Sequence, residues 1–370
     1  MKILHVEKKM KLSGQALRVS RVIRGLTARG HEVGLACPPG SALGDEAEGD
    51  GLSVCRMRMD GMRLYLSART LRRHIRHAGY QIVHPHGARD HLLSALALVG
   101  QRGVALVRTK HNMEPLHGGA FGRLLYNRRT TRIVAISQAV REVLMTSGVP
   151  GTQIDLAFTG IDTARFSPRP RDPGMAGRLG LPDGAFVVGL TARLASESVD
   201  APTLLRAFGQ IAPRYPHARL LLIGRGEDAM AKVAEELGIA DRVVFAGFVR
   251  DVPAVLSVVD LYVQPNRKAA LGTAALEAMA MAKPVVATRV GGHQEAVLEE
   301  QTGLLCPAAD PDAMAEAMAS LMERPPEALA EMGRKGRERA VELFDQERMI
   351  DQIEAAYRRV AGPSSDATRR

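Results

Sequence analysis

Residues 264–295 constrain the fold of this 370-residue chain more than any other segment. An apolar strand ends there, a turn that carries Gly272 follows, and residues 274–281 are strong helix formers. Residues 285–287 form a second apolar strand, which leads into a second glycine loop. Strand, helix and strand in this order place both glycine loops at the same edge of a parallel sheet, where α/β proteins bind their ligands.

The turn before the helix is suited to a phosphate. Gly272 and Thr273 stand at the helix start, where free N–H groups and the positive end of the helix dipole favour an anion. Glu277 lies one turn into the helix, where its carboxylate could accept hydrogen bonds from a ribose diol. The segment therefore predicts a nucleotide site.

This segment resembles the donor-site signature of the family 4 glycosyltransferases, whose phrase reads EGLGTALLEAMAxGxPVVATxxGGxxE. The two glutamates of the family pattern are separated by seven residues. Glu277 stands at the second glutamate position, whereas Ala269 stands where the first is expected. The positions that match the phrase are Gly272, Thr273, Leu276, Glu277, Ala278, Met279, Ala280, Pro284, Gly291, Gly292 and Glu295.

Short apolar strands alternate with helices along the rest of the chain, which predicts an α/β fold. Residues 3–6, a helix over residues 16–29 and a strand over residues 31–36 make one βαβ unit. The second half repeats the alternation. The resemblance implies the GT-B fold, in which two Rossmann-like parallel-sheet domains face a cleft.

We expect an N-terminal acceptor-side domain over residues 1–165 and a C-terminal nucleotide-sugar-binding domain over residues 166–344. The boundary falls in residues 165–175, which are rich in Pro and Arg and unsuited to helix or strand. The resemblance implies that the last helix, residues 345–361, packs back onto the first domain. Residues 362–370 have the composition of a disordered tail.

Charge is unevenly placed along the chain, whose formal net charge is +10. The first 165 residues hold 25 Lys and Arg against 12 Asp and Glu, a balance of +13, whereas the remainder hold 25 against 28, a balance of −3. A basic first half suits an anionic glycan or glycolipid acceptor, or the phosphates of a membrane. The charge alone would also suit nucleic acid, but the sequence has no recognisable nucleic-acid-binding motif, so no nucleic-acid partner is expected.

The sequence favours a cytoplasmic protein with possible contact at the inner face of the cytoplasmic membrane. It has no apolar run of 18 residues, and its first strand leads into charged residues rather than into an apolar signal core. Cys37, Cys55 and Cys306 are odd in number and lack metal-ligand spacing, which indicates reduced thiols.

Residues 83–87 end a strand with two histidines two positions apart. Such a pair could share a metal ion, but no third ligand is evident, so no metal is expected. The resemblance implies that His86 contacts the donor sugar as a catalytic residue, that His84 is structural, and that no cofactor is needed. A pair of ordinary loop histidines is the alternative.

Two other loops follow strands of the first half. Gly14 could bring the backbone close to the donor, although a plain turn is the alternative. Arg108, Lys110 and His111 belong to a phrase similar to one found near the acceptor cleft of lipopolysaccharide branches of the family. Three potential cations suit a phosphorylated or carboxylated acceptor, whereas a solvated basic loop is the alternative.

Arg193 follows the first strand of the second half. The resemblance implies that it clamps the donor diphosphate as part of the catalytic site, and the bidentate guanidinium suits that task. The family carries a lysine five or six residues later, but this chain has Ser198 and Val199 there. Lys268, next to Ala269, is a candidate substitute cation.

Phe248 and Val249 lie in a phrase that resembles the family's nucleobase loop, which holds the base largely through backbone groups. A mainly structural role is the alternative for this loop.

The resemblance implies a retaining glycosyltransferase that moves a sugar from a nucleotide-sugar donor, which is a substrate and not a cofactor, to a cell-envelope glycan or glycolipid acceptor. In the same-face mechanism usually given to the family, the leaving phosphate helps to deprotonate the acceptor. Ala269 and Ser198 keep open a second hypothesis, a nucleotide-sugar-binding pseudoenzyme that acts as a partner in glycan assembly. A sugar-nucleotide epimerase of the same fold is a third.

Residues 62–77 form a basic amphipathic helix, which is either a core helix with a solvated face or a membrane-surface helix. If it binds membranes, replacing Arg69, Arg72 and Arg73 by serine should weaken binding to anionic vesicles, because the three charges that attract lipid phosphates are removed. Vesicle co-sedimentation measures this, and unchanged binding would exclude a membrane role for the helix.

Overall fold

The computed structural model describes residues 1–11, 13–59, 64–116 and 119–361. They form two compact units, one made of Met1–Gly160 together with the segment from Gln346 on, and the other of Ile161–Asp345. The expected disordered tail, residues 362–370, lies outside the described residues, as do Met62 and Arg63 of the expected basic helix.

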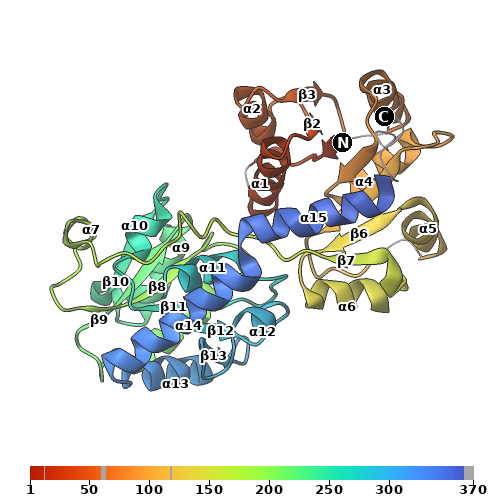
Figure 1. Cartoon of the computed structure of the whole chain (residues 1–370). Coiled ribbons are helices and arrows are strands. Elements are labelled where there is room, and N and C mark those ends of the chain that lie inside the picture. The colour runs from red at the N-terminus through yellow and green to blue at the C-terminus, as the bar shows by residue number, and fades with distance from the viewer. Residues whose placement is uncertain (12, 60–63, 117–118, 362–370) are drawn as a thin grey trace. The chain divides into compact units, whose positions relative to one another are not determined.

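The first unit is a seven-stranded parallel sheet with helices on both faces (Figure 1). The strand order β3-β2-β1-β4-β5-β6-β7 reverses between β1 and β4, which makes this the switch point of the sheet. The elements of this unit are β1 (Lys2–Val6), α1 (Gly14–Ala28), β2 (Glu32–Cys37), α2 (Ala42–Gly49), β3 (Ser53–Arg56), α3 (Leu64–Ala78), β4 (Ile82–Pro85), α4 (Ala88–Ala97), β5 (Ala105–Lys110), α5 (Gly119–Leu124), the π-helix η1 (Leu125–Arg129), β6 (Arg132–Ala135), α6 (Gln138–Thr146), the 3-10 helix η2 (Gly151–Gln153), β7 (Ile154–Leu156) and α15 (Gln346–Ala361).

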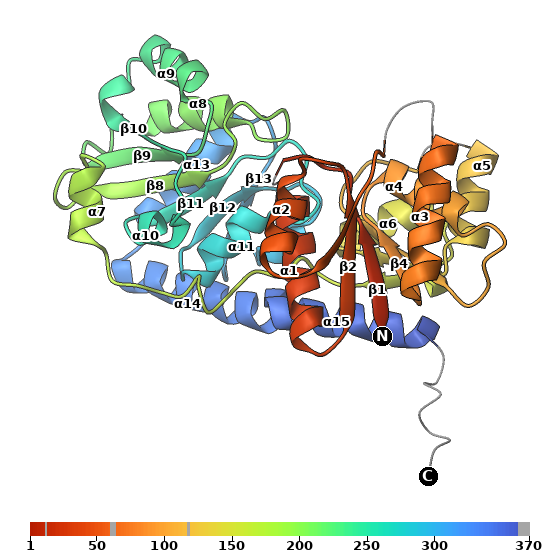
Figure 2. The same cartoon turned by 90° about the horizontal axis from the view of Figure 1, so that it is seen from above.

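Alternate residues of each strand divide between the two faces of this sheet. Ile3 packs with α1, α2 and α15, whereas Leu4 packs with α3 and α4 on the other face. α15 also packs against α1, which lies next to it in Figure 2. The apolar residues of α15 that pack in this unit are buried: Met349, Ile350, Ile353 and Tyr357.

The expected basic helix corresponds to α3, of which Leu71 and Ile75 are buried in the core. Tyr65 and Leu66 in its first turn are exposed, at 71% and 53%. The helix therefore has a core face and also offers apolar side chains to solvent beside its arginines. Within the described part of the chain, no helix is both long enough and apolar enough to span a membrane.

The second unit is a six-stranded parallel sheet of order β10-β9-β8-β11-β12-β13, which reverses between β8 and β11. The two parallel sheets with covering helices confirm the predicted α/β class with two Rossmann-like units. The elements of this unit are α7 (Pro173–Arg178), β8 (Phe186–Thr191), α8 (Ala201–Ile211), β9 (Ala218–Ile223), α9 (Glu227–Glu236), the 3-10 helix η3 (Ala240–Arg242), β10 (Val243–Gly247), α10 (Val252–Leu256), β11 (Leu261–Gln264), α11 (Thr273–Ala280), β12 (Val285–Thr288), α12 (His293–Ala296), β13 (Gly303–Cys306), α13 (Pro311–Met322) and α14 (Pro326–Phe344).

The strands at the second switch point pair only briefly. β8 and β11 are joined through Leu261↔Val188 and Tyr262↔Gly189. Beyond this pairing, the Tyr262 hydroxyl accepts a hydrogen bond from the Thr191 backbone N–H at 3.2 Å. At the end of β8, on the side of β11, this side-chain hydrogen bond thus takes the place of strand pairing.

Two glycines of α14 provide a test of how closely this helix packs in the second unit. A β-carbon on Gly333 would lie 2.0 Å from the carbonyl oxygen of Ala282, whereas one on Gly336 would lie 3.8 Å from the Met279 side chain. Gly333→Ala should therefore lower the free energy of unfolding by roughly 1–3 kcal/mol. Gly336→Ala should be neutral or stabilise by about 0.5–1 kcal/mol through helix propensity. Chemical denaturation measures both, and equal effects would contradict the close approach.

Candidate functional site

A cavity of about 620 Å³ lies at the carboxyl ends of β1, β4 and β5 in the first unit. His86 directly follows β4, Arg108 and Lys110 belong to the end of β5, and His111 follows them. The structure thus brings these four predicted residues together in the wall of one cavity. Gly14 lies outside that wall, at the first position of α1, where a β-carbon would meet nothing within 4 Å.

Three imidazoles form a hydrogen-bonded chain behind this cavity. His5 Nδ1 lies 2.9 Å from His86 Nε2, and His86 Nδ1 lies 3.1 Å from His111 Nε2. Burial lowers the pKa of His5 to about 3 and the pKa values of His86 and His111 well below the usual range, and nearby cations and histidines act in the same direction. The rings are therefore neutral at physiological pH. Because both nitrogens of His86 are already bonded, a polar contact with a ligand requires one of these bonds to be exchanged.

His5 is the third histidine that the sequence pattern did not reveal beside His84 and His86. The register of β1 and β4 pairs His5 with His84, and the ligand atoms of the three rings lie within 4.8 Å of one another. However, the two nitrogens of His84 are bonded to the Tyr357 hydroxyl and, at 2.7 Å, to Thr109 Oγ1. A divalent ion would have to break these bonds in a core that also holds a buried arginine, so the arrangement favours a hydrogen-bonded cluster over a metal centre.

Glu7 and Asp90 are two buried acids in the cavity wall that sequence reasoning missed. Gln15 Nε2 donates to Glu7 at 2.5 Å, and Asp90 Oδ2 accepts from the backbone N–H of Gly87 at 2.9 Å. Burial and the charge of Glu7 raise the pKa of Asp90 to about 7, and burial raises the pKa of Glu7. Their position in the sequence could have indicated both acids, because each lies after a strand that borders the switch point.

The basic side chains of the cavity are held by local contacts. Arg108 Nη1 donates to His91 Nδ1 at 2.9 Å, and its guanidinium lies 4.8 Å from the centre of the Tyr126 ring. Burial lowers the pKa of Arg108 to about 10, and burial together with Arg108 lowers the pKa of Lys110 to about 8. The wall contains the cationic side chains of Lys8, Lys9, Arg89, Arg108 and Lys110 and the carboxyl groups of Glu7, Asp90 and Glu114. Cationic side chains thus outnumber carboxyl groups, and partial protonation of Asp90 at neutral pH increases the excess of positive charge.

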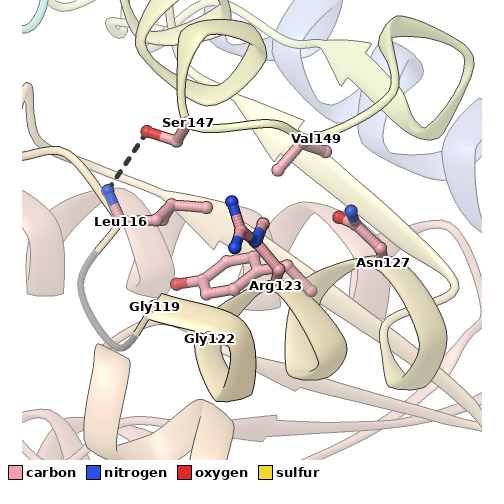
Figure 3. A pocket seen from close by; sticks show the side chains of 8 residues that line it. Leu116, Gly119, Gly122, Arg123, Asn127, Ser147 and Val149 are labelled. Carbon is pink, nitrogen blue, oxygen red and sulfur yellow. Dashed lines mark hydrogen bonds between the residues drawn. The ribbon is translucent and has the colours of Figure 1, made fainter.

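A smaller cavity of about 100 Å³ adjoins the larger one and shares Leu116, Gly122 and Tyr126 with it. Figure 3 shows the Arg123 side chain in this cavity and the hydrogen bond from the Leu116 N–H to Ser147 Oγ, which is 3.2 Å long. Through this shared wall, the larger cavity adjoins polar residues that the sequence did not suggest, which are Arg123, Asn127 and Ser147.

In the second unit, Arg193 lies on the loop that follows β8 and is exposed. The glycine turn after β9 packs against this loop, since a β-carbon on Gly224 would lie 1.8 Å from the carbonyl oxygen of Ala192. The Leu194 N–H also donates to the Arg225 carbonyl at 2.9 Å. Because Gly224 has no β-carbon, the turn can pack closely against the loop that carries Arg193 and hold its backbone in place.

Phe248 lies beside the same turn. The Gly224 N–H donates to the Gly247 carbonyl at 2.8 Å, and the Arg225 guanidinium lies 5.0 Å from the centre of the Phe248 ring. Phe248 is 65% exposed, while Val249 is half-buried. An exposed aromatic ring held by an arginine presents a flat surface on which a base could stack.

Gly272 is the N-cap of α11 and has a left-handed backbone, with φ of 88°. It provides no side-chain cap, so the N–H groups that begin with Thr273 are available to an anion at this edge. Glu277 is half-buried one turn further on. Burial raises the pKa of Tyr262, whose hydroxyl is bonded to Thr191, and the charge of Glu277 raises it further.

The two departures from the family phrase lie on loops that are joined to each other. The Arg267 N–H donates to the Ser198 carbonyl at 3.0 Å, and Arg267 Nε donates to Asp200 at 2.9 Å. Ala269 is buried, and its carbonyl accepts from the Gly292 N–H at 3.1 Å. Lys268 is exposed on the same segment. This edge therefore retains cations although Ser198 is not one.

The chain is similar to known glycosyltransferases in both sequence and structure. Residues 12–165 match the family model described as Glycosyltransferase Family 4, and residues 185–324 match Glycosyl transferases group 1. A D-inositol 3-phosphate glycosyltransferase of Saccharomonospora viridis is 31% identical over 309 residues, which cover 75% of this chain and 70% of that protein. A GDP-mannose-dependent alpha-(1-6)-phosphatidylinositol monomannoside mannosyltransferase of Mycolicibacterium smegmatis is 32% identical over 57% of each chain. The structure of Anabaena HepE in complex with UDP superposes with a TM-score of 0.86 at 23% identity and covers 96% of this chain and 99% of that one.

The buried carboxyl group of Asp90 predicts a pH-dependent stability. Its folded pKa of about 7 lies above the unfolded value of 3.8, so ionising it in the folded state costs free energy that grows as the pH rises from about 4 to 7. Asp90→Asn removes this cost and should raise the free energy of unfolding, relative to the original chain, by up to about 4 kcal/mol above pH 7. Denaturant titrations across this range measure the difference, with Asp183→Asn at an exposed site as the control. A difference that does not change with pH would contradict the raised pKa.

Proposed function

This chain belongs to glycosyltransferase family 4, and from that we propose that it is a retaining transferase that moves a sugar from a nucleotide-sugar donor to an anionic glycan or glycolipid of the cell envelope. The observation that carries the proposal is the edge of the second sheet at its switch point. There the uncapped start of α11 and Glu277 lie on one side of the switch, and Arg193 follows the strand on the other side.

In this proposal the second unit binds the donor. The diphosphate takes the N–H groups near Gly272 and Thr273 and the guanidinium of Arg193, because both are donors suited to phosphate oxygens. Glu277 accepts hydrogen bonds from the ribose, and Phe248 and Val249 border the base. The name of the GDP-mannose-dependent relative supports a nucleotide-sugar as the donor class.

The first unit takes the acceptor. Its cavity has more cationic than carboxyl groups in the wall, and Arg108 and Lys110 are the cations at the end of β5. This charge suits a phosphate or carboxylate on the acceptor. The named acceptors of the two relatives, inositol 3-phosphate and a phosphatidylinositol mannoside, both carry phosphate, which supports an anionic acceptor here.

The reaction exchanges one bond at the anomeric carbon on a single face of the sugar. The bond from that carbon to the diphosphate oxygen breaks, and the bond to the acceptor hydroxyl oxygen forms. The acceptor proton passes to the departing phosphate, so the step needs no protein nucleophile and, in this proposal, no metal ion. Arg193 and the α11 N–H groups stabilise the charge that develops on the phosphate, while His86 contributes a neutral ring beside the sugar.

The alternative is a nucleotide-sugar-binding protein that supports glycan assembly without catalysing transfer. Its basis is the pair Ala269 and Ser198, which replace two charged residues of the family. Removing one charged hydrogen bond to a transition state slows a reaction by roughly 30- to 1000-fold. The transferase names of both relatives favour the active enzyme, and turnover with the tightest-binding donor would decide between the two.

Contact with the inner face of the cytoplasmic membrane would bring the enzyme to a lipid-linked acceptor. The support is α3, whose exposed Tyr65 and Leu66 adjoin arginines on the same helix.

Calorimetric titration with UDP-, GDP- and ADP-sugars tests the donor site. One donor should bind in the micromolar range. Arg193→Ala and Glu277→Ala should each weaken binding by about 10- to 100-fold, as expected for the loss of charged hydrogen bonds worth roughly 1.5–3 kcal/mol. Arg206→Ala, an exposed arginine of α8, is the matched control. Lys268→Ala in the same series tests the substitute cation, which an unchanged affinity would exclude. Absence of binding across the panel would contradict the proposed donor site.

A further inference from the structure

A buried imidazole lies directly behind the uncapped end of α11. His293, the first residue of α12, is fully buried, and its Nδ1 lies 2.9 Å from the Thr288 carbonyl oxygen. Because a carbonyl can only accept, Nδ1 carries the proton, and Nε2 of the neutral ring is left as an acceptor. That Nε2 has no hydrogen-bond partner among the residues that the structure describes.

The unpartnered nitrogen faces the phosphate turn. A β-carbon on Gly272 would lie 2.7 Å from His293 Nε2 and 2.6 Å from its Cδ2, so the ring packs against the α-carbon of the N-cap residue. Gly272 itself provides no side-chain cap to α11. Two independent features therefore meet at this point: a helix start with free N–H groups, and a buried polar atom without a partner.

The chemistry of Nε2 decides what the ring can do there. As a bare lone pair it would repel a phosphate oxygen, whereas as an N–H it would donate to that oxygen and add a positive charge. Burial lowers the pKa of His293 to about 4, so the ring is neutral while the site is empty. A phosphate oxygen held beside Gly272 lies near the ring, favours its charged form and acts against burial.

We propose that His293 takes up one proton at Nε2 when a diphosphate binds at the start of α11, and that the resulting imidazolium is a cation of the donor site. The inference rests on the proposed donor site and adds to it a residue at a position that the family phrase leaves unspecified. The proton comes from solvent, and no bond of the ligand changes. The cation would stand in for the lysine that is missing at Ser198 and Val199.

Other charged groups lie on the elements around this ring and must be separated from it. α11 contributes Glu277, and Arg339 of α14 donates to the Ala296 carbonyl at 3.0 Å. The segment after β11 carries Lys268 and also Arg267, which is paired with Asp200. The segment that holds His293 itself contributes Glu295 and an ion pair between Arg289 and Glu299.

The test uses the whole chain and the nucleotide-sugar that binds best in the calorimetric panel. Each phosphate of a nucleotide-sugar has a single strongly acidic proton, so the ligand does not titrate near neutral pH. The Kd should rise by up to about tenfold per pH unit through the range in which only the complex holds the proton. Titrations in two buffers of different ionisation enthalpy should show net uptake that approaches one proton per ligand bound at mildly acidic pH.

His293→Asn keeps a donor for the Thr288 carbonyl but has no group to protonate at the Nε2 position. It should bind with a Kd that varies little with pH and without proton uptake. His217→Asn, at an exposed histidine of the same unit, is the control and should behave like the original chain.

The outcomes separate the inference from the proposed function. Uptake that persists in His293→Asn would assign the proton to another group and overturn the inference. Binding to the original chain without uptake would also overturn it, while the donor site would stand. Absence of binding at every pH would overturn both. If the variant does not fold, NMR titration of the His293 ring in the original chain decides, since its pKa must rise when the nucleotide-sugar binds.

Discussion

Parallel strand pairing is the constraint on which the rest of this structure depends. In each unit every strand ends at the same edge of its sheet, and the strand order reverses once, between β1 and β4 or between β8 and β11. The reversal separates the loops on either side of it and leaves polar side chains room beside an apolar core. Arg193 and Gly272, which are far apart in the sequence, therefore flank one switch point. The strands hold them there, so no direct interaction between the two residues is needed.

Burial then sets the charge of each edge differently. In the first unit several polar groups are buried, so desolvation keeps His86 and His111 neutral and raises the pKa of Asp90 to about 7. In the second unit the side chains of Arg193 and Lys268 are exposed to water. The first edge thus combines cations with buried groups whose pKa values are shifted, whereas the second presents backbone donors with solvated cations around them.

The apolar strands, the glycine turns and the position of His86, Arg108, Lys110 and His111 at strand ends could be predicted, because each depends on local sequence. That these four residues line one cavity was not predicted and follows from the pairing of β4 with β5. The partners of these residues could not be predicted either. His5 is part of an apolar strand in the sequence, and only the register of β1 against β4 places it beside His84. The burial of Asp90 and of His293 depends on packing from other elements, which a periodic pattern does not reveal. In the same way, Gly272 is recognisable as a turn residue, while the imidazole that requires glycine there is not.

The charge balance at the donor edge follows from the same distinction between exposed and buried groups. Arg267 is close to the missing lysine in the fold, but its charge already faces Asp200, whose side chain is 2% exposed. Lys268 is solvated, so its attraction for a diphosphate is weakened by water and salt. Neither water nor salt would shield the charge of a proton on His293, because the ring is fully buried behind Gly272. One buried charge that appears only with the ligand can therefore act more strongly on a phosphate than a permanent charge on the surface, and it leaves the empty site without the cost of a buried cation.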